Sequence, residues 1–149
     1  SAASFQGFQS YILNTTSDNL TGTGSFVKVP YDTLFFDTTG GFNMGTSQFV
    51  VPATGYWNYN ISVYPYRLGG ANTYCVIIIL INGTTAYRMY ELDYENMQTL
   101  GELMVNGSIL LNSTMGDVVE VQCAVGGAGL NVGFGGTASF CRFSGVKVG

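Results

Sequence analysis

Large hydrophobic residues alternate with polar ones along many short segments of this chain. The clearest case is the segment 55–61, in which Trp57, Tyr59 and Ile61 alternate with two asparagines. A period of two is that of a strand with one buried face. Apolar residues at helical spacing are nearly absent, and residues that favour strands dominate the sequence. The pattern therefore predicts an all-β protein.

Turn signals separate the predicted strands at regular intervals. Asn82-Gly83, directly after an apolar run, is the strongest hairpin signal, and Phe42 and Phe49 flank a small polar run as two strand ends that meet across a loop. Residues 112–116 are predicted to form a turn, and 126–136 a Gly-rich loop or distorted strand. The predicted strands are 5–13, 25–30, 34–36, 48–51, 56–66, 73–81, 85–94, 101–111, 117–125 and 137–148. Ten short strands in 149 residues are typical of one sandwich or jelly-roll domain.

Eight residues between positions 31 and 61, most of them aromatic, follow one another at separations of 6, 5, 7, 6, 2, 2 and 2 positions. They are Tyr31, Asp37, Phe42, Phe49, Gly55, Trp57, Tyr59 and Ile61. This spacing resembles the signature of the C1q-domain family, although Tyr31, Trp57, Tyr59 and Ile61 differ in kind from the residues usual there. The segments 107–111 and 115–121 resemble the family's GSxxL and GDxVxV strands, and Phe143-Ser144-Gly145 resembles its FSG.

The resemblance extends from Phe5 to Val148. It implies a ten-stranded jelly roll of two antiparallel sheets of the C1q and tumour-necrosis-factor type, occupying 1–149 as a single domain. Residues 1–4 are expected to be a disordered or expression-derived start. The resemblance also implies a homotrimer that recognises partners, often at the end of a collagen-like or other fibrous stalk, although the sequence contains no collagen repeat.

The amino-acid composition excludes several classes of function. Hydrophobic residues make up 46% of the chain and charged residues only 9%, a balance that excludes disorder and favours self-association. A net charge of −4 with five Lys and Arg argues against nucleic-acid binding. No apolar run is long enough for a transmembrane helix. Without histidine, Ser-His-Asp and Cys-His sites are impossible, so we expect no enzyme unless a pair of carboxylates converges in space.

Alternating acidic residues form the candidate metal site. Glu91, Asp93 and Glu95 would share one face of a strand, where their oxygens suit Ca²⁺. The alternative is a solvated, charged strand edge that discourages aggregation. No other cofactor is expected.

Possible glycosylation sites and the state of the cysteines bear on whether the protein is extracellular. Six Asn-x-Ser/Thr sequences occur, at Asn14, Asn19, Asn60, Asn82, Asn106 and Asn112. Asn82 and Asn112 lie on predicted turns and are the best candidates for glycosylation, but an Asn- and Thr-rich composition alone also produces such sequences. Cys75, Cys123 and Cys141 lie in apolar runs and are predicted to be buried free thiols, with a single disulfide as the alternative.

Surface aromatic residues form the candidate oligomer interface. In the strand predicted at 56–66, Trp57, Tyr59, Ile61 and Val63 would face the core, so that Tyr56, Asn58, Tyr64 and Tyr66 are available to a neighbouring subunit. We therefore expect an extracellular, non-catalytic homotrimeric head, secreted or on a cell or virion surface, that binds a receptor or a surface glycan. The alternative is a structural subunit of an extracellular filament or virion coat, whose function is self-assembly.

Overall fold

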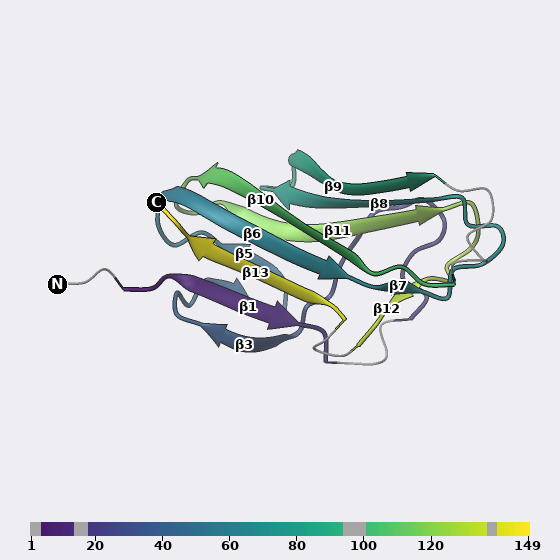
Figure 1. Ribbon diagram of the computed structural model, residues 1–149, viewed down its shortest axis with the longest axis horizontal. Helices are drawn as coiled ribbons and strands as arrows, with labels where there is room; N and C mark the ends of the chain where they lie inside the picture. The colour runs from purple at the N-terminus through teal and green to yellow at the C-terminus, as the bar shows by residue number, and fades with distance from the viewer. Residues whose placement is uncertain (1–3, 14–17, 94–100, 137–139) are drawn as a thin grey trace.

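The computed structural model describes residues 4–13, 18–93, 101–136 and 140–149, and these ranges form strands and no helix (Figure 1). No described helix could therefore span a membrane. The strands are β1 (Gly7–Tyr11), β2 (Val27–Lys28), β3 (Thr33–Asp37), β4 (Phe42–Asn43), β5 (Gln48–Val50), β6 (Gly55–Val63), β7 (Pro65–Tyr66), β8 (Tyr74–Ile81), β9 (Thr85–Asp93), β10 (Val105–Ser113), β11 (Val118–Gly126), β12 (Gly133–Phe134) and β13 (Arg142–Lys147).

Two large antiparallel sheets pack face to face, as the jelly-roll prediction required. One sheet has the order β10-β6-β13-β1-β3, and the other has the order β4-β5-β11-β8-β9, with β2 paired to β11. A third, two-stranded sheet joins β12 to β7. In Figure 1 the five-stranded sheet lies toward the viewer and the sheet of β11, β8 and β9 lies behind and above it.

Aromatic side chains fill the space between the two sheets. Phe8 is central, because its ring stacks on Phe49 and Phe42 at centroid distances of 4.2 and 5.2 Å and meets Phe143 edge-on at 5.1 Å. Trp57 and Tyr59 are also fully buried. Such rings bury large apolar areas, so they supply much of the hydrophobic stabilisation of the domain.

Two of the predicted turns form as expected. Phe42 is the direct partner of Phe49 in the short β4–β5 ladder. Asn82 and Gly83 join β8 to β9 with φ angles of 54° and 70°, the left-handed geometry of a tight hairpin turn.

Several predicted boundaries differ from those of the structure, and two of these differences have a clear physical cause. The strand predicted at 56–66 ends at Val63, because the amide of Tyr64 donates to the Sγ of Cys141 at 3.3 Å instead of continuing the ladder. The turn predicted at 112–116 begins later, because Asn112 and Ser113 pair with Tyr56 and Gly55 as the last residues of β10. Tyr64 and Tyr66 therefore do not continue the alternation that begins at Tyr56.

The three cysteines are buried free thiols, as predicted. Cys75 and Cys123 approach most closely, with 4.0 Å between their sulfurs. They lie on the adjacent strands β8 and β11 but are not opposite one another, since Cys75 pairs with Val125 and Cys123 with Ile77. Diagonal neighbours in a sheet are farther apart than a disulfide normally spans, which accounts for the unbridged pair.

Candidate functional site

The outer side of the five-stranded sheet carries the candidate site. Its register places one residue from each strand in a row that crosses the whole sheet. The row runs Ser108, Asn60, Ser144, Gln9 and Phe36. Four of these five side chains are amides or hydroxyls, and no hydrogen bond links them to one another among the described contacts. Their polar groups are thus available to solvent or to a partner.

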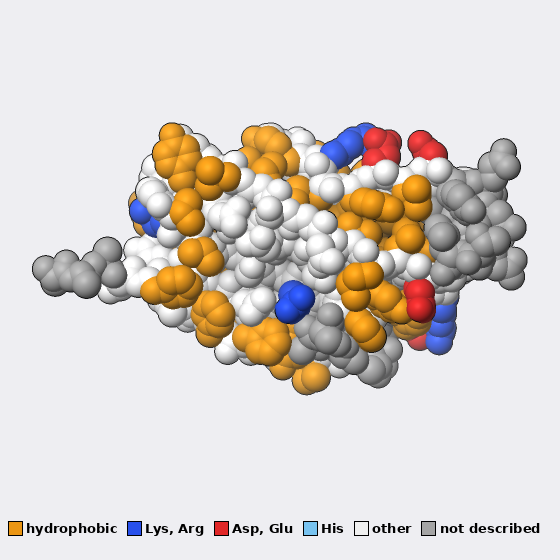
Figure 2. All heavy atoms as spheres, in the orientation of Figure 1, with side chains coloured by type: hydrophobic (Ala, Val, Ile, Leu, Met, Phe, Trp, Pro, Cys, Tyr) orange, Lys and Arg blue, Asp and Glu red, His pale blue; other side chains and the backbone are white. Residues whose placement is uncertain are grey.

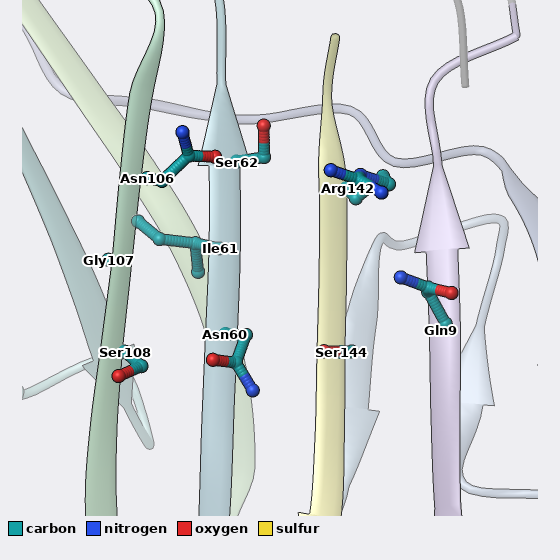
Figure 3. Close-up of a pocket in the computed structure, with 9 residues that line it drawn as sticks. All are labelled: Gln9, Asn60, Ile61, Ser62, Asn106, Gly107, Ser108, Arg142 and Ser144. Carbon is teal, nitrogen blue, oxygen red and sulfur yellow. The ribbon is translucent and has the colours of Figure 1, made fainter. Parts of the chain in front are cut away.

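A shallow hollow of about 550 Å³ lies over this row. Its lining comes from four strands that are far apart in the sequence, and Figure 3 shows the side chains around it. The lining residues are Gln9, Asn60, Ile61, Ser62, Asn106, Gly107, Ser108, Arg142 and Ser144. The hollow is therefore predominantly polar and uncharged, with one cationic side chain.

Apolar side chains border the polar centre. At one edge, Phe35 packs on Tyr11 at 4.4 Å between ring centroids, and Phe36 on Phe5 at 6.0 Å. Both Phe35 and Phe36 are exposed. A register shift between Gln9 and Ser10 leaves Phe35 without a partner in β1, while Phe36 is paired with Gln9.

Leu110 and Tyr56 are exposed at the opposite edge, and Met104 beside Ser62. We call Phe5, Phe35, Phe36, Tyr56, Met104 and Leu110 the apolar border. Figure 2 shows this arrangement as hydrophobic side chains around a largely white centre.

Arg142 is the single charge in the lining of the hollow. It begins β13, pairs with Tyr11 on one side and Ser62 on the other, and is exposed. The described ion pairs are Arg67–Asp18 and Arg88–Glu91, so no described carboxylate neutralises Arg142. Nothing in the local sequence predicted this site, because only the sheet register brings Arg142 next to Gln9.

The predicted interface residues separate into two groups. Tyr56 and Asn58 lie on the outer side of the five-stranded sheet, where Tyr56 is 52% exposed. Tyr64 instead stacks on Phe140 at 4.6 Å, and Tyr66 pairs with Gly133 beneath the guanidinium of Arg67. The structure thus brings the first two to the candidate site and places the other two at the sheet's far end.

The residues of the signature lie in the core, apart from Asp37 and Gly55, which are half-buried. Tyr31 donates its hydroxyl hydrogen bond to the carbonyl of Ser62 at 3.0 Å, and burial raises its pKa well above the usual value. Tyr59 shares a 3.0 Å hydrogen bond with Ser113, and burial raises its pKa to about 12. Both phenols therefore stay protonated at neutral pH and act as hydrogen-bonding parts of the core.

Gly55 of the signature and Gly145 of the FSG segment are both explained by the close approach of neighbouring atoms. A Cβ at Gly145 would lie 2.7 Å from the ring of Phe8 and 3.1 Å from that of Tyr59. A Cβ at Gly55 would overlap the carbonyl oxygen of Gly149. The spacing of the signature therefore records how the two sheets fit together.

Asp37 organises the loop between β3 and β4. Its Oδ1 accepts hydrogen bonds from Thr39 N at 2.8 Å, Thr39 Oγ1 at 2.6 Å and Gly40 N at 3.1 Å, and its Oδ2 accepts one from Phe42 N at 2.9 Å. Partial desolvation raises the pKa of Asp37, but these hydrogen bonds to the charged form outweigh it and lower the pKa below the ordinary value.

Two of the three acidic candidates for calcium, Glu91 and Asp93, lie on the edge strand β9. Glu91 is exposed and forms an ion pair with Arg88 at 2.8 Å, and Asp93 is exposed at the end of the strand. Glu95 lies outside the described residues, and no group of three potential ligands occurs within them. Calcium binding by Glu91, Asp93 and Glu95 stays a prediction, which thermal melts with and without chelator would test.

The two favoured sequons differ in their surroundings. The amide nitrogen of Asn82 donates to Asp117 at 2.9 Å and its oxygen accepts from Val118 N at 2.8 Å, so this side chain is already part of the turn. Asn112 is exposed on β10. Glycosylation stays a prediction at both positions, which are both exposed, and the side chain of Asn112 makes no hydrogen bond among the described contacts.

Sequence comparisons and structure comparisons give different results. No protein-family model and no curated protein matches the sequence. Many solved structures match the fold. The globular domain of the zebrafish complement 1qA protein superposes with a TM-score of 0.63 at 14% identity, covering 97% of this chain and 98% of that chain.

Murine APRIL at pH 8.0 matches with a TM-score of 0.67 at 11% identity, over 97% of this chain and 100% of that chain. The chain has the C1q/TNF-like jelly-roll fold. Eiger TNF from S. frugiperda matches as well, with a TM-score of 0.63 at 14% identity over 99% of this chain and 94% of that chain. The C1q/TNF-like domain is thus recognisable by its fold, while identities this low carry no information on its ligand.

Proposed function

We propose that this chain is a non-catalytic, homotrimeric C1q-like head that recognises a protein receptor or a surface glycan outside the cell. The observation that carries the proposal is the outer side of the five-stranded sheet. It combines exposed apolar side chains with an almost uncharged centre, and charged residues are depleted in the same way at the centre of protein interfaces.

The apolar border is also asymmetric. Phe35 and Phe36 lie at the β3 edge of the sheet, while Tyr56 and Leu110 lie at the β10–β6 edge. Contact between two different edges is a heterologous interface, which closes into a ring when the rotation between copies permits. A trimeric ring agrees with what the C1q/TNF-like fold implies. If the rotation does not close, the same contact yields a filament, which is the alternative function as a structural subunit.

Leu110→Glu tests the interface. Leu110 is 57% exposed in the single chain, and the substitution would bury a carboxylate in the assembly, so we expect association to weaken by at least about 100-fold. Met44→Glu is the matched control, because Met44 is 48% exposed but lies between β4 and β5, away from this face. The association of both variants is measured by sedimentation velocity over a range of protein concentrations. Unchanged association of Leu110→Glu would contradict the proposed interface.

Recognition is tested separately with the assembled protein. A glycan and protein array probed with the trimer is expected to give a small set of ligands, and electron microscopy of the same sample is expected to show discrete particles. Ordered polymers without ligand binding would support the structural-subunit alternative instead. Such ligands would contact the loops between strands. The sequence of a surface loop can change without disturbing the core.

A further inference from the structure

The candidate interface has an unusual distribution of polarity. Most protein interfaces have an apolar centre and a polar rim. Here the centre is the polar row with Asn60, Ser144 and Gln9, and the exposed apolar residues surround it. Copies that cover this face would seal the apolar border against one another first, and would enclose the polar hollow behind that seal.

An enclosed hollow of this kind places a constraint on Arg142. Polar cavities of this size retain water, which satisfies amides and hydroxyls such as Asn60 and Ser108. A guanidinium that loses bulk solvent needs a counter-charge, because an unpaired buried charge is strongly destabilising. No described carboxylate of the same chain pairs with Arg142, and none lines the hollow.

We propose that the assembled protein binds a small oxyanion of the sulfate or phosphate class in this hollow, with Arg142 as its principal ligand. The guanidinium presents paired N–H donors that match an oxyanion. Gln9 on the neighbouring strand β1 lines the same hollow, and its side-chain amide offers a further donor (Figure 3). The inference rests on the proposed function, since it is the covering by other copies that excludes solvent.

The site predicts that anions stabilise the assembly in a saturable way. Thermal melts of the full chain are recorded with sodium sulfate or phosphate titrated from micromolar to low millimolar concentration, and with chloride at equal ionic strength. We expect sulfate or phosphate to raise Tm by several degrees and then saturate, as ligand linkage requires. Non-specific stabilisation by these salts instead rises steadily at much higher concentration.

Arg142→Gln and Arg88→Gln separate the site from general salt effects. Arg88 is a suitable control because it is an exposed arginine on β9, in the other sheet. We expect Arg88→Gln to keep the saturable response and Arg142→Gln to lose it. In an anion-poor buffer, Arg142→Gln should dissociate less than the unmodified protein, because an uncompensated charge has been removed from the interface.

The molecular mass of each sample distinguishes failure of the inference from failure of the proposed function. A chain that stays monomeric overturns the proposed trimer and, with it, the enclosed site. An oligomer whose Tm responds equally to sulfate in all three proteins overturns the anion site alone. An Arg142→Gln oligomer that is weaker even without oxyanions would overturn it too, because the counter-charge would then be a carboxylate of the adjoining copy.

Discussion

The inner and outer sides of the five-stranded sheet are made by the same strands but differ in chemistry. On β6, Trp57 and Tyr59 face inward and are fully buried, whereas Asn58 and Asn60 face outward. On β13, Phe143 and Gly145 face inward, whereas Arg142 and Ser144 face outward. The inner side is closely packed against the second sheet, while the outer side is open and carries amides and hydroxyls, such as those of Asn60 and Ser144, that make no side-chain hydrogen bond among the described contacts.

This difference separates the determinants of fold from those of function. Inward residues must fit one another, and most of the residues whose spacing resembles the C1q-domain signature are of this kind. Outward residues are free of that constraint, and under the proposed function they determine what covers the sheet. The fold is therefore shared with proteins of 11–14% identity. The polar centre with Arg142 is described for this chain alone.

Trp57→Ala is expected to have the largest effect on the inner side. The indole is fully buried and its Nε1 donates to the carbonyl of Ala53 at 2.9 Å. Its loss should reduce the free energy of unfolding by about 3–5 kcal/mol. Asn60→Ala, on the same strand but outward, should change it by less than about 0.5 kcal/mol. Urea unfolding followed by circular dichroism, at a concentration where the chain is dissociated, compares them. Equal effects would refute the division between the two sides.

Gly145→Ala is expected to have an intermediate effect. Its Cβ would force the rings of Phe8 and Tyr59 to move in a packed core, which should cost about 1–3 kcal/mol. Gly129→Ala is the control, since a Cβ there meets nothing within 4 Å. The control should be neutral or slightly stabilising. If Gly145→Ala proves as stable as the control in the same unfolding assay, the close packing described for the inner side is incorrect.

Of the three destabilising substitutions, Asp37→Asn is expected to have the smallest effect, about 1 kcal/mol, because the carboxylate organises a loop at the edge of the sheet. The folded protein lowers the pKa of Asp37, so its contribution is present above the unfolded pKa and is lost as pH falls through the lower folded pKa. When unfolding is measured from pH 6 to pH 2, the free energy of unfolding should fall less in Asp37→Asn than in the unmodified protein. Parallel pH profiles would show that Asp37 has no such role.

Alternation and turn chemistry predicted most of the fold. The inward residues of β6, the Asn82-Gly83 turn and the pairing of Phe42 with Phe49 all follow from local sequence. The end of β6 at Val63 does not, because it depends on a contact with the distant Cys141. The hollow was not predictable for the same reason. Gln9 and Arg142 become neighbours only through the order β6-β13-β1, which no local pattern encodes.

The mass of the unmodified protein in solution tests the central claim most directly. If the outer side of the five-stranded sheet is an interface, light scattering at micromolar concentration should give three times the 15.9 kDa of one chain. The mass should fall toward that of one chain in Leu110→Glu but not in Met44→Glu. A stable species of 15.9 kDa for the unmodified protein at that concentration would contradict the account.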